Sequence, residues 1–224
     1  MMHKRREQLN EIYELLLAAF GPQHWWPGET TFEIILGAIL TQNTSWTNVA
    51  KAIANLKGAG ALEPETLHAL DAEVIEKLIR PAGYFRIKTK RLQNFMQWLF
   101  DEHGGDLDAL AQVQTRRLRA ELLGISGIGP ETADSILLYA LNRPVFVVDT
   151  YTARIMVRHG LIEPDVDYEQ LQYLFESNLE PDVALFNEYH ALLVRVGKDF
   201  CKPKPKCTAC PLNPLPRTVE GECD

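Results

Sequence analysis

The sequence predicts an all-α protein. Apolar residues recur at helical spacing along most of the chain, as Leu9, Ile12, Leu16 and Phe20 do near its start. Only the segment VFVV at 145–148 has the composition of a strand, and it is too short and isolated to form a sheet. No stretch approaches the roughly 18 uninterrupted apolar residues that a membrane-spanning helix needs, so we expect no membrane contact.

Local signals place each expected helix. The first ends near Gly21 and Pro22, because proline cannot continue a helix. The segment 31–42 is apolar on several sides and is expected to be buried. The segment 45–58 has Ser45 as its expected cap and Gly58 as its stop. From their periodicity, further helices are expected at 63–70, 71–80, 87–103, 115–124, 130–141, 150–160, 168–178 and 182–200.

Composition limits the possible functions. The 224 residues, 46% of them hydrophobic, suffice for one large or two small cores. The 23 Lys and Arg against 30 Asp and Glu give a net charge of −7, which by itself argues mildly against binding nucleic acid. A local basic face can still coexist with an acidic remainder. The basic N-terminus turns amphipathic rather than uniformly apolar, so we expect no secretory signal and a cytoplasmic protein.

The segment GISGIGPETADSI at 124–136 predicts a tight turn between two helices. Glycines at 124, 127 and 129 allow positive φ and close approach of the backbone to an anion. Pro130 suits the first position of the second helix, whose N-terminus can bind an anion. Glu131 and Asp134 favour that helix start through its dipole. An ordinary αα-hairpin without a ligand is the alternative.

The segments LLGISGIGPETADSILLYA and VFVVDTYTARI together resemble the helix-hairpin-helix motif, and the loop ending in an aspartate, of the endonuclease III superfamily of DNA glycosylases. The resemblance extends from about residue 31 to the C-terminal cysteines. It implies an enzyme that excises damaged bases, acts as a monomer on double-stranded DNA containing a damaged base, and is associated with the nucleoid. It also implies two helical domains with a DNA-binding cleft between them: 31–141, which includes the helix-hairpin-helix, and 1–30 plus 142–224, which includes the cysteine loop 201–223.

The resemblance also predicts which reaction is catalysed. Bifunctional members carry a lysine two positions after the last hairpin glycine, where it attacks the sugar, and Glu131 is the matching residue here. A monofunctional glycosylase, which excises the base without cutting the strand, is therefore expected. Two alternatives remain: a bifunctional glycosylase and lyase for oxidised pyrimidines that uses another amine, and a non-catalytic module that binds damaged DNA.

Asp149 is the expected catalytic residue. Breaking an N-glycosidic bond develops positive charge on the sugar, which a carboxylate stabilises while it orients or deprotonates a water molecule. The alternative role is a simple N-cap for the helix at 150–160. Both roles can hold at one position.

Three of the four tryptophans, Trp25, Trp26 and Trp46, lie close together in the sequence. With Glu131, they make the chain similar to the 3-methyladenine glycosylases of the superfamily, which stack the alkylated base between aromatic rings. A cationic base departs without an acid and is attracted to a π-face. The alternative is that the tryptophans fill the core, and adjacent Trp25 and Trp26 must point in different directions.

DNA-binding roles follow from the same resemblance. Gln42 matches the residue that fills the place of the flipped nucleotide and so offsets part of the cost of flipping; the alternative is a polar helix end. Gly127 and Gly129 would bind phosphate. Lys88, Lys90 and Arg91 add local positive charge, for which the alternative is a solvated face.

All four cysteines, Cys201, Cys207, Cys210 and Cys223, lie in the last 24 residues. Disulfides are rare in a reducing compartment, so the cluster predicts a metal site, either an iron–sulfur cluster or zinc. The resemblance favours a structural [4Fe–4S] cluster. The spacing departs from the family pattern, with a first gap one residue shorter and a last gap much longer than five, which puts Cys223 in doubt as a ligand. Lys202, Lys204 and Lys206 could contact DNA phosphates.

Overall fold

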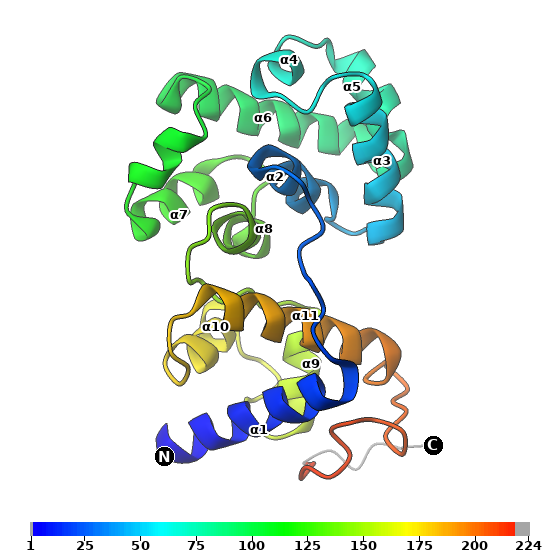
Figure 1. Ribbon diagram of the computed structural model, residues 1–224, viewed down its shortest axis with the longest axis vertical. Coiled ribbons are helices and arrows are strands. Elements are labelled where there is room, and N and C mark those ends of the chain that lie inside the picture. Colours follow the sequence, from blue (N-terminus) through cyan, green and yellow to red (C-terminus); the bar gives the residue numbers. More distant parts are fainter. Residues whose placement is uncertain (1, 218–224) are drawn as a thin grey trace. The chain divides into compact units, whose positions relative to one another are not determined.

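The computed structural model describes residues 2–217, and every regular element in this part of the chain is a helix, with no β-strand (Figure 1). The elements in chain order are α1 (Met2–Phe20), α2 (Thr31–Leu40), α3 (Trp46–Gly58), α4 (Pro64–His68), α5 (Ala72–Ile79), η1 (Arg80–Ala82), α6 (Phe85–His103), η2 (Asp108–Gln112), α7 (Thr115–Gly124), α8 (Pro130–Ser135), η3 (Ile136–Ala140), α9 (Thr150–Arg158), α10 (Tyr168–Glu176) and α11 (Val183–Asp199). None of these helices is long and apolar enough to cross a membrane.

The elements differ from the expected ranges at particular places. The helix expected at 31–42 ends at Leu40, since Thr41 is its C-cap and Asn43 has a φ of 54°. The helix expected at 130–141 changes after Ser135 into a π-helical turn, η3, in which the Leu141 N–H donates to the Ile136 carbonyl at 3.1 Å. The short 3-10 helix η2 has no periodic pattern that would have predicted it.

The chain forms two compact units. We call Trp26–Arg143 the middle unit, and the residues up to Trp25 together with the chain from Pro144 onward the terminal unit.

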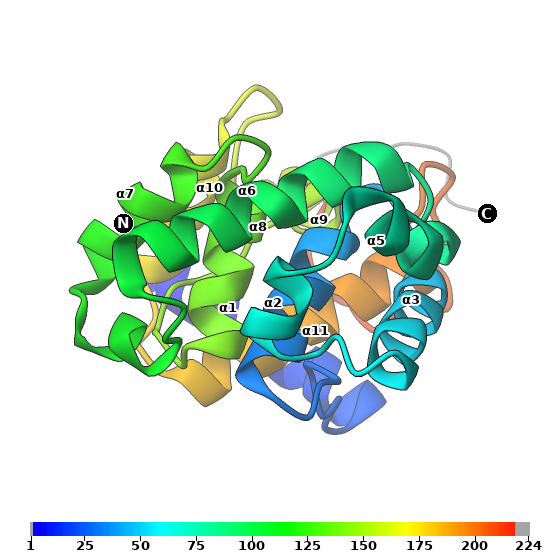
Figure 2. The ribbon, with the colours of Figure 1, turned by 90° about the horizontal axis from the view of Figure 1, so that it is seen from above.

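The core of the middle unit is built around α2. This helix contacts α3, α6, α8 and η3, and its residues Ile35, Leu36, Ile39 and Leu40 have no exposed surface. The burial predicted from its apolar composition is confirmed, because neighbours cover the helix on more than one side. Helix α6 in turn lies along α5, as Figure 2 shows from above.

A buried ion pair joins the two helices of the predicted hairpin, α7 and α8. The Arg119 guanidinium donates two hydrogen bonds to the Asp134 carboxylate, at 2.7 and 3.0 Å, and Asp134 is fully buried. Bidentate pairs of this kind fix geometry strongly. Asp134 therefore ties the hairpin together, rather than only favouring its helix start as the sequence suggested.

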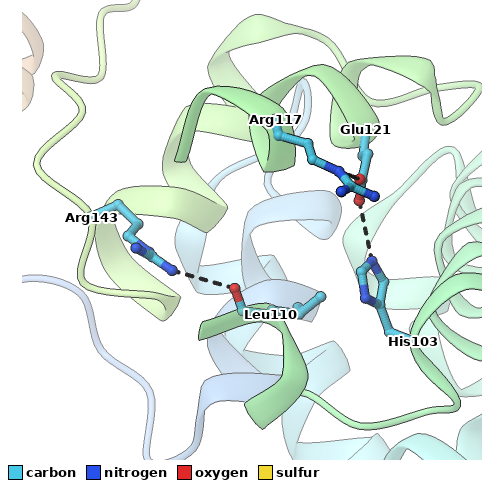
Figure 3. Close-up of polar contacts among 5 residues, drawn as sticks. All are labelled: His103, Leu110, Arg117, Glu121 and Arg143. Atoms are coloured by element: carbon cyan, nitrogen blue, oxygen red, sulfur yellow. Dashed lines mark hydrogen bonds and ion pairs between the residues drawn. The ribbon is translucent and has the colours of Figure 1, made fainter. Parts of the chain in front are cut away.

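Polar contacts also hold the hairpin helix α7 to the rest of the middle unit (Figure 3). Glu121 of α7 accepts a hydrogen bond from Arg117 Nε at 2.8 Å and lies 3.2 Å from His103 Nε2, at the end of α6. Arg143, at the end of the unit, donates to the backbone carbonyls of η2, including Leu110 at 3.3 Å. These contacts tie both ends of the hairpin to neighbouring elements.

The terminal unit packs α11 against α1 and α9. Tyr189 of α11 is buried and donates from its hydroxyl to the Leu9 carbonyl at 2.7 Å. Gly197 lets α9 approach closely, since a Cβ there would lie 2.6 Å from the Cβ of Tyr151. The segment 145–148 is buried and is not part of a strand or helix. Side chains of α10 satisfy the backbone of Phe146, whose N–H donates to Glu176 and whose carbonyl accepts from Gln172.

Candidate active site

The loop between α7 and α8 is held from two neighbouring elements. Gln42, just after α2, donates from Nε2 to the Gly127 carbonyl at 3.0 Å and to Thr132 Oγ1 at 2.8 Å. Asn94 of α6 donates to the Ser126 carbonyl at 2.8 Å. The structure thus brings Gln42 and Gly127, both expected DNA-binding residues, into direct contact. Asn94 is a further loop contact that the sequence did not reveal.

The N–H groups of Gly127 and Gly129 have no hydrogen-bond acceptor among the described residues. Gly127 has a φ of 97°, which favours glycine, and Gly129 is the N-cap of α8. Unpaired N–H groups at a helix start attract anions. The loop is therefore able to bind a phosphate oxygen through its backbone.

Lys88 does not have the exposed position that a phosphate contact requires. Its side chain is fully buried and donates from Nζ to the carbonyls of Leu40 and Ala82, both at 2.8 Å. Burial, assisted by the nearby charge of Arg91, lowers the pKa of Lys88 to about 8. The expectation for Lys88 is corrected on this ground: its ammonium group satisfies carbonyls at the ends of α2 and η1.

Lys90 is exposed, two positions further along the same helix. It lines a groove of about 330 Å³ together with residues of α4, α5 and α6. Its ammonium is therefore accessible to an external anion, unlike that of Lys88.

Two of the three expected pocket tryptophans lie together in the middle unit. The rings of Trp26 and Trp46 meet edge to face with centroids 5.0 Å apart, and Tyr139 of η3 stacks on Trp26 with a centroid distance of 4.9 Å. Trp25 belongs to the terminal unit. Tyr139 lies within the apolar motif SILLYA, where nothing in the sequence distinguished it from a core residue.

The stacking of Trp26 on Tyr139 limits where a base could bind. A base held between two rings needs them about 7 Å apart, twice a van der Waals contact of about 3.5 Å. The Trp26 and Tyr139 rings are closer than this, so they stack directly on each other and leave no room for a base between them. Gly37 lies close behind both tryptophans, since a Cβ there would be 3.2 Å from Trp26 Nε1 and 3.4 Å from Trp46 Cη2. A stacked base would therefore use another face of these rings.

Asp149 is the N-cap of α9. Its Oδ1 accepts from the Thr152 N–H at 2.7 Å and from the Thr152 hydroxyl at 2.9 Å. The side chain is only 11% exposed, and its orientation is fixed through this one oxygen. The capping role considered from the sequence is thus present, and it leaves Oδ2 outside these two hydrogen bonds.

His190 of α11 lies beside that second oxygen, with Nε2 3.8 Å from Oδ2 of Asp149. This distance is beyond a hydrogen bond. Burial lowers the pKa of His190 from 6.5, while the Asp149 carboxylate acts in the opposite direction. The imidazole is therefore neutral at neutral pH and leaves the carboxylate its charge. The sequence offered only a weak signal for this contact, a histidine among the apolar residues of an amphipathic helix.

Glu131, the residue that replaces the lysine of bifunctional enzymes, is the second residue of α8 and is exposed. Pro130 precedes it as the first residue of the helix. The position therefore presents a carboxylate rather than an amine.

The cysteine loop is tied to α9 by two arginines. Arg154 donates to the Cys201 carbonyl at 2.6 Å, and Arg158 donates to Cys201 Sγ at 3.1 Å and to the Lys202 carbonyl at 2.7 Å. Donors directed at a ligand sulfur are typical around thiolate-bound metals. Lys202, Lys204 and Lys206 are all exposed.

Three of the four cysteines, Cys201, Cys207 and Cys210, line one small cavity of about 30 Å³. Cys201 and Cys210 are free thiols, whereas Cys207 takes part in a disulfide, which differs from the expectation drawn from the sequence. With that disulfide reduced, three thiolates near cationic groups would suit a metal or an iron–sulfur cluster in chemical terms. In the part of the chain described, however, no three His, Cys, Asp or Glu side chains are gathered closely enough to hold a metal ion. The fourth cysteine, Cys223, lies outside the described residues.

Comparison with known proteins connects these features to a family. The description "HhH-GPD superfamily base excision DNA repair protein" matches residues 36–181. A protein of Methanocaldococcus jannaschii, named as a candidate DNA repair glycosylase, is 46% identical over 213 residues, which cover 95% of this chain and 97% of that protein. Endonuclease III of Sulfolobus acidocaldarius is 29% identical over 181 residues, 80% of this chain and 78% of the relative.

Solved structures agree with the predicted fold. The 3-methyladenine DNA glycosylase of H. pylori, bound to 1,N6-ethenoadenine, matches with a TM-score of 0.72 and 29% identity, over 87% of this chain and 97% of that one. An endonuclease III–DNA complex matches with a TM-score of 0.79 over 94% of each chain, and its 23% identity shows a common fold alone. The all-α fold predicted from the sequence is confirmed.

Proposed function

Given that the chain belongs to the HhH-GPD superfamily of base excision DNA repair proteins, we propose that this DNA glycosylase is monofunctional and releases alkylated purines such as 3-methyladenine from double-stranded DNA. Base excision and DNA binding are the properties of the family. The choice of substrate and the absence of strand cleavage are the proposed part.

The observation that carries the proposal is the exposed carboxylate of Glu131 at the second position of α8. A lyase needs an amine that attacks the sugar and forms a Schiff base, and a carboxylate cannot form one. Similarity to the 3-methyladenine glycosylase of H. pylori over most of its length supports an alkylated purine as substrate.

Asp149 would perform the central chemical step. As the bond between base and sugar breaks, positive charge develops on the sugar, and a negative carboxylate lowers the energy of that state. Thr152 holds Oδ1, and the neutral His190 beside Oδ2 does not cancel the charge. The base departs with the bonding electron pair, and water then adds to the sugar carbon and gives up a proton to the Asp149 carboxylate or to solvent. An alkylated purine that is already cationic becomes neutral on leaving, so it needs no acid.

Trp26 and Trp46 are the proposed contacts of the base. A cationic base is attracted to the face of an electron-rich ring, and tryptophan gives the strongest attraction of this kind. Because Trp26 already stacks on Tyr139 and meets Trp46 edge to face, the base would contact a part of these rings outside those two contacts. Trp25 remains a further candidate from the sequence.

DNA binding is assigned to the hairpin loop and its neighbours. The N–H groups of Gly127 and Gly129 would receive a phosphate oxygen, and Gln42, which contacts the same loop, would fill the place of the flipped nucleotide. Lys90, Lys202, Lys204 and Lys206 are exposed and would add electrostatic attraction.

A [4Fe–4S] cluster is the proposed cofactor of the C-terminal loop, with zinc as the alternative. Cys201, Cys207 and Cys210, which share one cavity, would be ligands, and Cys223 is the proposed fourth. When bound, the cluster would serve to order the loop. Arg154 and Arg158 hold the loop to α9 through their own hydrogen bonds.

A base-release assay on methylated DNA tests the proposal. We expect release of 3-methyladenine, and release of neither 3-methyladenine nor 7-methylguanine would refute the substrate assignment. Incubation with abasic DNA and borohydride tests the second part. We expect no covalent adduct; a trapped adduct would instead support a bifunctional enzyme of the endonuclease III type.

A further inference from the structure

The side-chain amide of Gln42 has hydrogen bonds at both ends. Its Nε2 donates to the Gly127 carbonyl at 3.0 Å and to Thr132 Oγ1 at 2.8 Å. Its Oε1 accepts from Nη1 of Arg91, on α6. All of these partners lie in the middle unit, so a residue just after α2 is held jointly by the hairpin and by α6.

Arg91 also packs against the hairpin loop itself. A Cβ at Gly127 would clash with Cγ of Arg91, closer than real Cβ contacts come. The absence of a side chain at Gly127 therefore serves two purposes: it allows the φ of 97°, and it makes room for the arginine stem. Arg91 thus contacts both Gln42 and the loop that Gln42 binds.

The guanidinium group determines which way the amide points. Arginine is a donor only, so it must face the oxygen of the amide and not its NH₂ group. With Oε1 directed to Arg91, Nε2 is directed to Gly127 and Thr132. A glutamine without this donor could rotate about its side-chain torsions, and fixing such a side chain costs conformational entropy on binding. Holding it beforehand removes part of that cost.

We infer that Arg91 is a positioning residue that holds Gln42 against the hairpin loop, so that the side chain filling the place of the flipped nucleotide and the loop binding the phosphate meet DNA as one preorganised element. This inference rests on the role proposed above for Gln42. It assigns Arg91 an action through Gln42, distinct from a general attraction to phosphate.

A double-mutant cycle on binding tests this inference. The variants Gln42→Ala, Arg91→Met and the double variant are compared for affinity to a duplex with a tetrahydrofuran abasic analogue and to the same duplex undamaged. The measured quantity is the ratio of the two affinities. A lost contact to a charged donor lowers affinity by about tenfold. We expect each single variant to lower the ratio by about that factor, and the double variant to be no worse than Gln42→Ala alone.

Further variants separate positioning from charge and from folding. Arg91→Lys retains a donor for Oε1 and should restore part of the ratio. Arg86→Met removes a more exposed arginine from the same helix and should leave the ratio unchanged. A phosphate contact alone would make Arg91→Met weaken both duplexes equally and would leave the ratio intact. That outcome, or additive losses in the double variant, would overturn the inference.

The result is independent of the proposed catalytic activity. If the wild-type protein releases no methylated base, the proposed function fails, while the binding ratio still reports on Arg91. If base release is observed and the cycle is additive, the proposed function stands and the positioning role of Arg91 is wrong. Thermal unfolding of each variant verifies that it is folded.

Discussion

Asp149 combines two roles that a single substitution separates. Asn is as good an N-cap as Asp, so Asp149→Asn keeps an acceptor for the Thr152 N–H and removes only the charge. We expect the rate of base release to fall by roughly 10²–10³-fold, the effect of losing one electrostatic contact to a transition state. Affinity for DNA should change little. Single-turnover base release and a binding assay measure the two quantities.

Asp182 provides the matched control, because it caps α11 by accepting from the Leu185 N–H at 2.7 Å and has no proposed catalytic role. Asp182→Asn should retain the wild-type rate. Normal base release by Asp149→Asn would show that the carboxylate is only a cap and would favour a different catalytic group.

His190 makes the stability of the protein depend on pH. Its pKa in the folded state is below 6.5 because of burial, while the unfolded chain protonates near the ordinary value. The unfolded state therefore binds more protons as the pH falls below about 6.5, and folding is destabilised there. We expect the free energy of unfolding to decrease on going from pH 7 to pH 5, and to do so less in His190→Asn. The difference in slope should reach at most about 1.4 kcal/mol per pH unit.

Urea unfolding at several pH values measures this dependence. His159 is also shifted downward by burial, but it contributes to wild type and variant alike, so the difference between them isolates His190. Parallel pH profiles would mean that His190 is protonated as easily in the folded protein as in the unfolded chain.

The burial and the contacts of single side chains were the features of the site that the sequence predicted least well. Lys88 and Lys90 look alike in a basic segment, yet one is buried on two carbonyls and the other is exposed. The helical phase of α6 decides between them. One of the carbonyls that Lys88 binds belongs to Leu40 of α2, which is 48 residues away in the sequence. The contact between His190 and Asp149 likewise joins two helices about 40 residues apart.

The hairpin owes part of its stability to the pair between α7 and α8. Asp134 is fully buried and binds Arg119, which is 22% exposed. Removing one partner of a buried pair leaves an uncompensated charge and costs about 3–5 kcal/mol, and partial exposure of the arginine places Asp134→Ala near the lower end. We expect a loss of about 3 kcal/mol in the free energy of unfolding, measured in urea.

Arg117→Ala is the comparison variant for this prediction. Arg117 lies on α7, as Arg119 does, and pairs with Glu121 at 2.8 Å, but its side chain is 76% exposed. Exposed pairs contribute about 0–1 kcal/mol, so this variant should be close to wild type. Equal losses in both variants would show that burial of Asp134 does not govern its contribution.

Helices were predictable where periodicity and end signals agree. The end of α1 at Phe20 and the start of α8 at Pro130 follow from Gly21–Pro22 and from proline at a first helical position. The π turn η3 had no such signal, because its residues are apolar in any helical phase and the packing of Tyr139 on Trp26 appears only in three dimensions. The end of α2 was placed two residues late, since the bonds of Gln42 to the hairpin are tertiary contacts.

For the whole molecule, the cysteine loop predicts a measurable cofactor. If Cys201, Cys207 and Cys210 hold a [4Fe–4S] cluster, the purified protein should contain iron and sulfide and absorb visible light. Cys210→Ser should lose iron and lower the stability of the folded protein, since binding free energy of a metal site is also folding free energy. Elemental analysis distinguishes the alternatives: zinc without iron would establish the second candidate, and neither metal would contradict the site.

The net charge of −7 requires that DNA binding arise from local positive charge. The cysteine loop has three exposed lysines in one five-residue stretch: Lys202, Lys204 and Lys206. Each lysine that contacts a phosphate contributes about −0.9 to the slope of log K against log salt. Alanine at all three positions should therefore reduce the magnitude of that slope by up to about 3 and weaken binding to damaged and undamaged duplexes equally.

Alanine at the exposed Lys51 and Lys77 of the middle unit should change the slope little. An equal change in slope per lysine in both sets would mean that total charge governs the affinity, and the position of these lysines would then be irrelevant.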